Sequence, residues 1–159
     1  MKLSEGVEQG LHCALLLAEA PAGVPLPRRV LAEHYGLPEA YLAKHLQALT
    51  RAGLLHATPG PSGGFRLARP VGEITVLDVL DAIEGPASPF VCQEIRQQGT
   101  GAARPEECTR PCAIASVMVR AHQAWRESLR AVTLDQLVKR VPQALRKRNR
   151  AKFGTGPLT

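Results

Sequence analysis

Residues 38–70 constrain the fold of this chain most, because a helical pattern there runs directly into a hairpin pattern. Leu42, Leu46 and Leu49 recur at spacings of four and three, which predicts a helix with one buried face. The opposite face carries side chains that can reach phosphates and base edges: Tyr41, Lys44, His45, Gln47 and Arg51. We therefore expect this helix to dock in the major groove of DNA.

A break at Gly53 separates this helix from two short predicted strands, residues 54–58 and 65–68. The glycine- and proline-rich residues between the strands predict a hairpin turn. A polar-faced helix followed by such a hairpin is typical of the recognition helix and wing of a winged helix-turn-helix. An ordinary helix–hairpin element of a small α/β domain is the alternative, and the polar helix face favours DNA binding over it. The wing residues expected at the DNA are Ser62, Gly63, Gly64 and Arg66.

Two helices are predicted before the recognition helix. The first covers residues 4–20, with Ser4 as its N-cap, and the second covers 26–36. Arg28 and Arg29 lie near the start of the second helix, where contacts with phosphate are favourable. Solvated surface charge explains these two arginines equally well.

Beyond the wing, the pattern becomes wholly helical except for one long loop. Thr75 and Gly85 bound a capped helix, residues 86–111 form a loop without periodicity, and residues 112–131 form a long helix. Thr133 opens a further short helix with a second capping box. The fold class expected is therefore mainly α with a small β-hairpin wing.

The long helix carries an apolar stripe that has no partner in the rest of the pattern: Ile114, Val117, Met118, Ala121, Trp125 and Leu129. Such a helix usually packs against a second subunit, so we expect a homodimer. The domain boundaries follow from these elements. We expect a DNA-binding domain over 1–85, a cysteine-containing loop over 86–111, a dimerisation region over 112–140 and a basic tail over 141–159.

The net charge of +6 belongs to the C-terminal end of the chain. Seven cations with no acid between them lie there, and the rest of the chain is nearly neutral: Lys139, Arg140, Arg146, Lys147, Arg148, Arg150 and Lys152. Composition favours disorder for the tail, whose arginines would add unspecific DNA affinity. No apolar run is long enough to cross a bilayer and no export signal is recognised, so we expect a cytoplasmic protein with reduced cysteines.

The order of these parts, with several local motifs, resembles the IscR/NsrR/RsrR family of bacterial transcription regulators. The motifs are Met1-Lys2-Leu3-Ser4, Tyr41-Leu42-Ala43-Lys44, the wing sequence from Gly60 to Pro70, Glu73-Ile74-Thr75, Ile83-Glu84-Gly85, and Cys92, Cys108 and Cys112. The resemblance covers residues 1–138. It implies a homodimer on a near-palindromic operator, with an iron–sulfur cluster that sets the DNA affinity.

The cluster ligands are sought among residues with paired spacing. Glu8 and His12 are four residues apart, as are Cys108 and Cys112, and together they would make a four-ligand set for a [2Fe–2S] cluster. Similarity to the RsrR branch implies that this cluster bridges two subunits. Cys92 is a further candidate, as a third thiolate of a [4Fe–4S] cluster with Glu8 as the fourth ligand. We prefer [2Fe–2S], and we expect the remaining cysteine, Cys13, to be a buried inert thiol.

We expect a cluster-based redox sensor that represses transcription. Four other interpretations compete with it. A disulfide-based switch among Cys92, Cys108 and Cys112 would need no metal, and it is the serious alternative. Structural zinc sites normally use paired cysteine knuckles, and only one close pair exists here. No phosphate loop or Cys–His–acid set indicates an enzyme. A protein-interaction module without DNA binding is disfavoured by the arginines and lysines around the helix-turn-helix.

Overall fold

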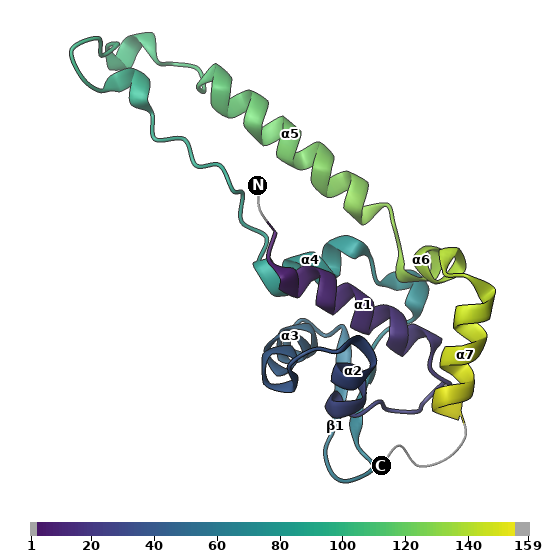
Figure 1. The fold of residues 1–159 in the computed structure, drawn as a ribbon. Helices are drawn as coiled ribbons and strands as arrows, with labels where there is room; N and C mark the ends of the chain where they lie inside the picture. The colour runs from purple at the N-terminus through teal and green to yellow at the C-terminus, as the bar shows by residue number, and fades with distance from the viewer. Residues whose placement is uncertain (1–2, 155–159) are drawn as a thin grey trace. The chain divides into compact units, whose positions relative to one another are not determined.

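The computed structural model describes residues 3–154 and shows a mainly helical chain with one antiparallel hairpin (Figure 1). The elements are α1 (Glu5–Glu19), α2 (Arg28–Tyr35), α3 (Glu39–Arg51), β1 (Leu55–Thr58), β2 (Gly64–Leu67), α4 (Val76–Glu84), α5 (Ala113–Arg130), α6 (Leu134–Arg140) and α7 (Gln143–Gly154). Short 3-10 turns lie at Val71–Glu73, Ile95–Gln97 and Pro105–Glu107. The predicted fold class, mainly α with a hairpin wing, is confirmed.

The chain forms two compact units. Residues 87–128 make up one unit, and residues 3–86 together with 129–154 make up the other. The helix α6, which the sequence grouped with the dimerisation region, packs with the DNA-binding part on α1. Its Leu134 side chain is fully buried there.

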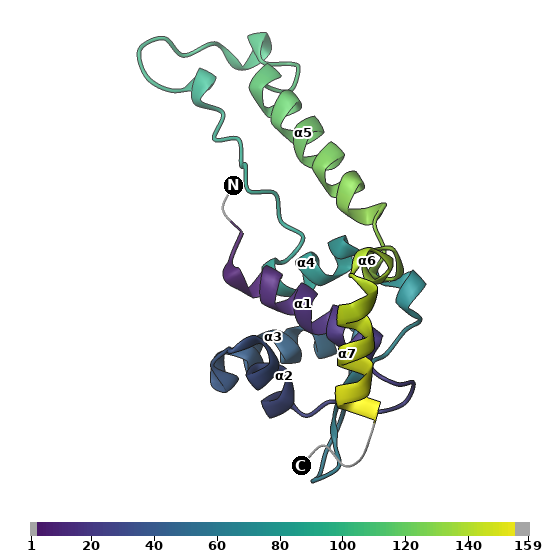
Figure 2. The same cartoon turned by 45° about the vertical axis from the view of Figure 1, so that its right-hand side comes forward.

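The core of the larger unit is built mainly from leucines. On α3 the three predicted core residues, Leu42, Leu46 and Leu49, are all fully buried. This face packs against α1, α2 and α4, so the helix-turn-helix is held on the first helix of the chain (Figure 1; Figure 2). The turn between α2 and α3 passes through Gly36, which has a φ of 64° and therefore a conformation that favours glycine.

The hairpin pairs Leu55 with Leu67 and Thr58 with Gly64. A bridge from Leu26 anchors it: the Leu26 amide donates to the Phe65 carbonyl and the Phe65 amide donates to the Leu26 carbonyl, both at 2.9 Å. The Leu26 backbone approaches so closely that a Cβ at Gly64 would lie 2.5 Å from its carbonyl oxygen. Gly64 therefore allows the wing to join the body of the domain.

Both predicted capping boxes are present. The Thr75 hydroxyl accepts from the Asp78 amide at the start of α4, and the Thr133 hydroxyl accepts from the Gln136 amide at the start of α6. The predicted cap at Ser4 differs, because the Ser4 side chain makes no bond within α1. Its hydroxyl and amide donate to the Glu84 carboxylate at the end of α4, which lowers the pKa of Glu84.

The basic tail is not disordered where the structure describes it. The helix α7 packs on α1, with Phe153 buried in the core and the Asn149 amide donating to the Glu19 carboxylate at 2.6 Å. Composition missed this helix because only a few of its residues face the core. The end of the predicted tail, residues 155–159, lies outside the described residues, as do Met1 and Lys2.

In the smaller unit, the predicted loop contains two 3-10 turns and then leads into α5 (Figure 1). No residue of α5 is buried. The exposed fractions of Ile114, Val117 and Met118 are 65, 53 and 41 %. None of the helices within residues 3–154 combines the length and the apolar character needed to cross a membrane.

Candidate functional site

The outer face of α3 is polar and exposed, as predicted for a recognition helix. Tyr41, Lys44, Gln47 and Arg51 are exposed to solvent. The structure does not place His45 with them, because the His45 side chain is buried and only 7 % exposed. His45 is therefore a correction to the predicted DNA-facing set.

His45 lies between the recognition helix and α1. Its ring fills the space beside Gly6, where a Cβ would lie 2.3 Å from the His45 Cε1 atom. The ring also contacts Tyr41 edge-on, with centroids 4.9 Å apart. Burial, followed by the charge of Lys44, lowers the pKa of His45, and the Glu84 charge partly opposes this. A neutral His45 thus connects α1 with the exposed Tyr41.

The two arginines of α2 are half-exposed but paired within the chain. Arg28 donates to the Glu39 carboxylate and Arg29 donates to the Glu33 carboxylate, both at 2.8 Å. Such surface pairs contribute about 0–1 kcal/mol each, so they open readily when a stronger anion approaches.

The predicted wing residues divide into two kinds. Ser62 and Arg66 expose their side chains, whereas Gly63 is buried in the turn. A Cβ at Gly63 would lie 2.1 Å from the Thr58 carbonyl oxygen, and its amide donates to the Gly60 carbonyl at 3.0 Å. Gly63 and Gly64 therefore shape the wing, and Ser62 and Arg66 are the predicted contact residues whose side chains it exposes.

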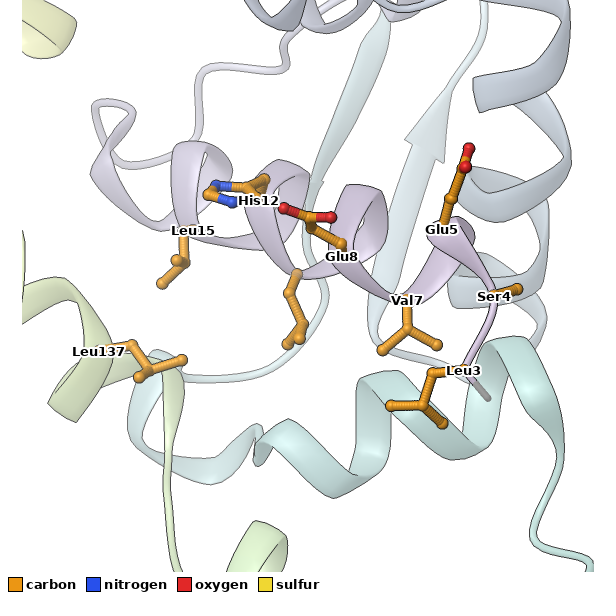
Figure 3. Close-up of a pocket in the computed structure, with 9 residues that line it drawn as sticks. Leu3, Ser4, Glu5, Val7, Glu8, His12, Leu15 and Leu137 are labelled. Carbon is orange, nitrogen blue, oxygen red and sulfur yellow. The ribbon is translucent and has the colours of Figure 1, made fainter. Parts of the chain in front are cut away.

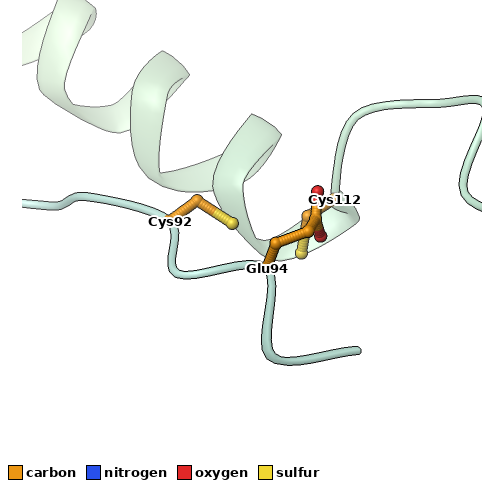
Figure 4. A group of neighbouring side chains, drawn as sticks. All are labelled: Cys92, Glu94 and Cys112. Atoms are coloured by element: carbon orange, nitrogen blue, oxygen red, sulfur yellow. The ribbon is translucent and has the colours of Figure 1, made fainter. Parts of the chain in front are cut away.

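A second group of candidate ligand side chains lies in the smaller unit. Cys92, Glu94 and Cys112 each offer a ligand atom, and these atoms lie within 4.8 Å of one another (Figure 4). Within the part of the chain that the structure describes, Cys108 does not belong to this group, although it is half-buried. Cys108 ends a 3-10 turn while Cys112 precedes α5, so the two cysteines do not share a helix face.

Sequence reasoning missed Glu94, which stands two residues after Cys92. Glu94 has a φ of 50°, and it is the one residue other than glycine with positive φ among those described. This strained conformation aims its carboxylate at Arg96, which donates to it at 2.5 Å. Arg96 also donates to the Arg110 carbonyl at 2.7 Å and thereby links the middle of the loop with its C-terminal end.

Cys112 has the environment of a reactive thiol. Hydrogen bonds from the backbone amides of Ala115 and Ile114, at the start of α5, lower the pKa of Cys112. The Cys92 side chain and the Arg96 charge add to this effect. Thiolates next to a carboxylate suit an iron centre, since thiolates are the usual ligands of iron–sulfur clusters.

The two predicted ligands of the first helix lie along one pocket of the larger unit. Glu8 and His12 stand one turn apart on α1, beside a cavity of about 530 Å³ that is otherwise mainly apolar (Figure 3). The apolar lining consists of Leu3, Val7, Leu11, Leu15 and Leu137. Tyr35 of α2, which sequence reasoning did not single out, donates its hydroxyl to the His12 carbonyl at 2.9 Å and contacts the His12 ring.

The fourth cysteine, Cys13, is fully buried in the core of the larger unit. Burial raises the pKa of Cys13 to about 12. A thiol in this environment stays protonated, in agreement with its predicted inert role.

Three comparisons place these features among known proteins. The model of the Rrf2 family, described as an iron-dependent transcriptional regulator, matches residues 3–140. YwgB of Bacillus subtilis, named an HTH-type transcriptional regulator, is 31 % identical over 142 residues, which are 89 % of this chain and 86 % of YwgB.

Solved structures agree with this result. CymR, the global cysteine regulator of B. subtilis, matches with a TM-score of 0.71 and 26 % identity over 89 % of this chain and 99 % of CymR. IscR of T. potens matches with a TM-score of 0.67 and 26 % identity over 91 % of this chain and 90 % of IscR.

Proposed function

Because the chain belongs to the Rrf2 family of transcriptional regulators, we propose that it is a homodimeric redox sensor whose iron–sulfur cluster controls its affinity for a near-palindromic operator. The family makes the chain a DNA-binding regulator and not an enzyme. Repression is the mode that we propose. The observation that supports a redox sensor is the group of Cys92, Glu94 and Cys112, whose ligand atoms lie within 4.8 Å of one another.

The DNA interface consists of α3 and the wing. Tyr41, Lys44, Gln47 and Arg51 enter the major groove, and Ser62 and Arg66 contact the backbone or the minor groove. Arg28 and Arg29 bind phosphates after leaving their carboxylate partners. The support for this arrangement is that all of these side chains, unlike His45, reach solvent.

The dimer interface is the apolar stripe of α5. Ile114, Val117 and Met118 are each more than 40 % exposed, and burial of apolar surface is worth about 25 cal/mol per Å². An 18-residue helix with no buried residue gains this energy when it packs on a second copy of itself.

The proposed ligand set adapts the one expected from sequence. Cys112 is kept, and Cys92 replaces Cys108 as its thiolate partner because only Cys92 lies in the group with Cys112. Glu8 and His12 of a partner subunit complete four ligands for a [2Fe–2S] cluster, which we prefer to [4Fe–4S]. Glu94 is the competing carboxylate within the chain. The cluster, when bound, supplies one-electron redox chemistry, and mixed nitrogen and thiolate ligation raises its potential.

Two contacts of α1 connect its proposed ligands with the DNA-binding elements. Tyr35 holds the His12 backbone against α2, and His45 fills the space beside Gly6 against α3. A displacement of α1 would therefore move both helices of the helix-turn-helix. In our proposal, a change in cluster state displaces α1 through Glu8 and His12.

A disulfide switch is the second candidate, and the short separation of Cys92 and Cys112 favours it. The lowered pKa of Cys112 would make it the attacking thiolate. Formation of the Cys92–Cys112 disulfide releases two electrons and two protons, and a peroxide would accept them and be reduced to water or alcohol.

Anaerobic purification with iron and sulfide analysis, followed by EPR of the dithionite-reduced protein, separates the two candidates. The cluster proposal expects a reducible cluster in the wild type, a changed spectrum in His12→Ala, and loss of the cluster in Cys92→Ser and Cys112→Ser. Cys108→Ser is the matched control and should retain it. If the wild-type protein contains no iron after anaerobic reconstitution, the cluster proposal is wrong and the disulfide switch is the remaining candidate.

A further inference from the structure

We infer that α7 is an additional DNA-binding element, which contacts the phosphate backbone beside the wing. This inference rests on the proposed binding of DNA through α3 and the wing. The helix α7 begins at Gln143, beyond residue 140, where the match to the family ends. It therefore extends the DNA interface of this chain past the part that the family shares.

Two buried side chains fix the position of α7. Phe153 is 2 % exposed and packs into the core beside the ring of His34, with ring centroids 5.8 Å apart. Asn149 is buried one turn earlier and donates to the Glu19 carboxylate of α1 at 2.6 Å. Because a buried carboxylate–amide contact is costly to break, α7 stays in place instead of trailing as a flexible tail.

The remaining faces of α7 are strongly cationic. Lys147, Arg148, Arg150 and Lys152 are all exposed, and no acid follows Asp135 in the sequence. Successive residues are about 100° apart around a helix, so Arg148 and Arg150 flank the buried Asn149 on opposite sides. Both flanks therefore present charge to solvent.

One of these flanks meets the wing. Arg150 of α7 and Arg66 of β2 line the same surface cavity of about 590 Å³, together with the segment that follows α1. The other flank meets the end of α2, where the charges of Lys152 and Arg148 lower the pKa of His34 after the larger effect of burial. Figure 1 shows α7 running from α6 toward the hairpin.

A polyanion with closely spaced charges is the partner that fits this surface. The proposed DNA contact of Arg66 places phosphates next to Arg150, since the two side chains share one cavity. Double-stranded DNA carries a charge about every 1.7 Å along its axis, so a duplex that reaches Arg66 also brings phosphates to Arg150 and to Lys147, which lies three residues earlier on the same side of α7. The contacts carry no base specificity, because they reach only phosphates.

Binding of the full-length protein to a labelled mixed-sequence 40-bp duplex, titrated at several salt concentrations, tests this inference. The test variant is Lys147→Gln/Arg150→Gln, whose two exposed cations are three residues apart and share the side of α7 that faces the wing. The matched control is Lys139→Gln/Arg140→Gln on α6. Each variant removes two exposed positive charges per protomer, and neither variant replaces Phe153 or Asn149, which hold α7 in place. Thermal melting verifies that both variants fold.

We expect the α7 variant to bind about tenfold more weakly at 100 mM salt and to lose about two from the slope of log affinity against log salt. The control should stay within about twofold of the wild type. Equal losses in both variants, or no loss in either, would overturn the inference while leaving α3 and the wing as the interface. A wild type that binds no duplex would contradict the proposed function itself.

Discussion

Gly6 determines where the imidazole of His45 lies, although it carries no side chain itself. Helical spacing places His45 at the boundary of the two faces of α3, three residues after Leu42 and four residues after Tyr41, and we predicted a DNA contact for it. In the structure the ring turns inward because Gly6 leaves room for it on α1. A pattern within one helix cannot reveal a cavity that a different helix provides, which is why this residue was misassigned.

Gly6→Ala should destabilise the fold and weaken DNA binding. The new Cβ would lie 2.3 Å from the His45 Cε1 atom, and overpacking costs about 1–3 kcal/mol. Helix propensity alone would raise the free energy of unfolding by about 1 kcal/mol, because alanine favours a helix more than glycine does. A decrease in the free energy of unfolding would therefore show the effect of the His45 contact. Urea unfolding measures it, and Gly72→Ala, which meets nothing within 4 Å, is the control. A stabilised Gly6→Ala variant would contradict the contact.

Alkylation of the cluster-free protein should distinguish the cysteines. Burial raises the pKa of Cys13 to about 12, whereas helix amides lower the pKa of Cys112. At pH 7 the thiolate fraction, and hence the rate with iodoacetamide, is then larger for Cys112 by roughly tenfold or more. The ratio of the Cys112 alkylation rate to the Cys13 alkylation rate should decrease as the pH rises. Mass spectrometry of timed samples measures both rates, and equal rates would show that Cys13 is not enclosed.

At the scale of elements, the sequence predicted most of what local chemistry determines. The two Thr-based capping boxes, the glycine breaks and the hairpin turn each act over a few residues, and each was found where expected. The helix α7 depends instead on the bond of Asn149 to Glu19 of α1, 130 residues away in sequence, and on Phe153, which lies against the His34 ring of α2. Glu94 likewise joins Cys112 only through the path of the loop.

Removal of one capping box should have a measurable effect of its own. Thr75→Ala deletes the hydroxyl that accepts from the Asp78 amide at 3.1 Å, and loss of such a cap lowers the free energy of unfolding by about 1 kcal/mol. Thr100→Ala, in the exposed loop, should leave stability nearly unchanged. Urea denaturation of the two variants makes the comparison. A smaller loss for Thr75→Ala than for Thr100→Ala would argue against the cap.

At the scale of the whole molecule, the proposed association of two chains would bury the exposed apolar stripe on α5. Val117→Glu places a charge in the proposed interface and should convert the dimer into monomers at micromolar concentration. Gln123→Glu adds the same charge at an exposed polar position of the same helix and should remain dimeric. Sedimentation velocity measures the oligomeric state of both variants. A Val117→Glu dimer as stable as the control would place the interface elsewhere.

The ligand set of the cluster also belongs to this scale, and sequence could define only part of it. Cys112 was proposed from its spacing to Cys108, whereas Cys92, twenty residues away, was only a further candidate until the fold of the loop placed it beside Cys112. Glu8 and His12 were recognised as a pair because helical spacing is a local property, and both line one pocket of α1.

The most direct test of a redox-sensing regulator is its anaerobic affinity for a selected operator duplex in three states: cluster oxidised, cluster reduced and cluster-free. Fluorescence anisotropy at one fixed salt concentration gives the three dissociation constants. We expect the dissociation constants of at least two states to differ by about tenfold or more, since coupling energies of 1–3 kcal/mol are typical of linked sites. Equal affinity in all three states would contradict control of DNA binding by the cluster.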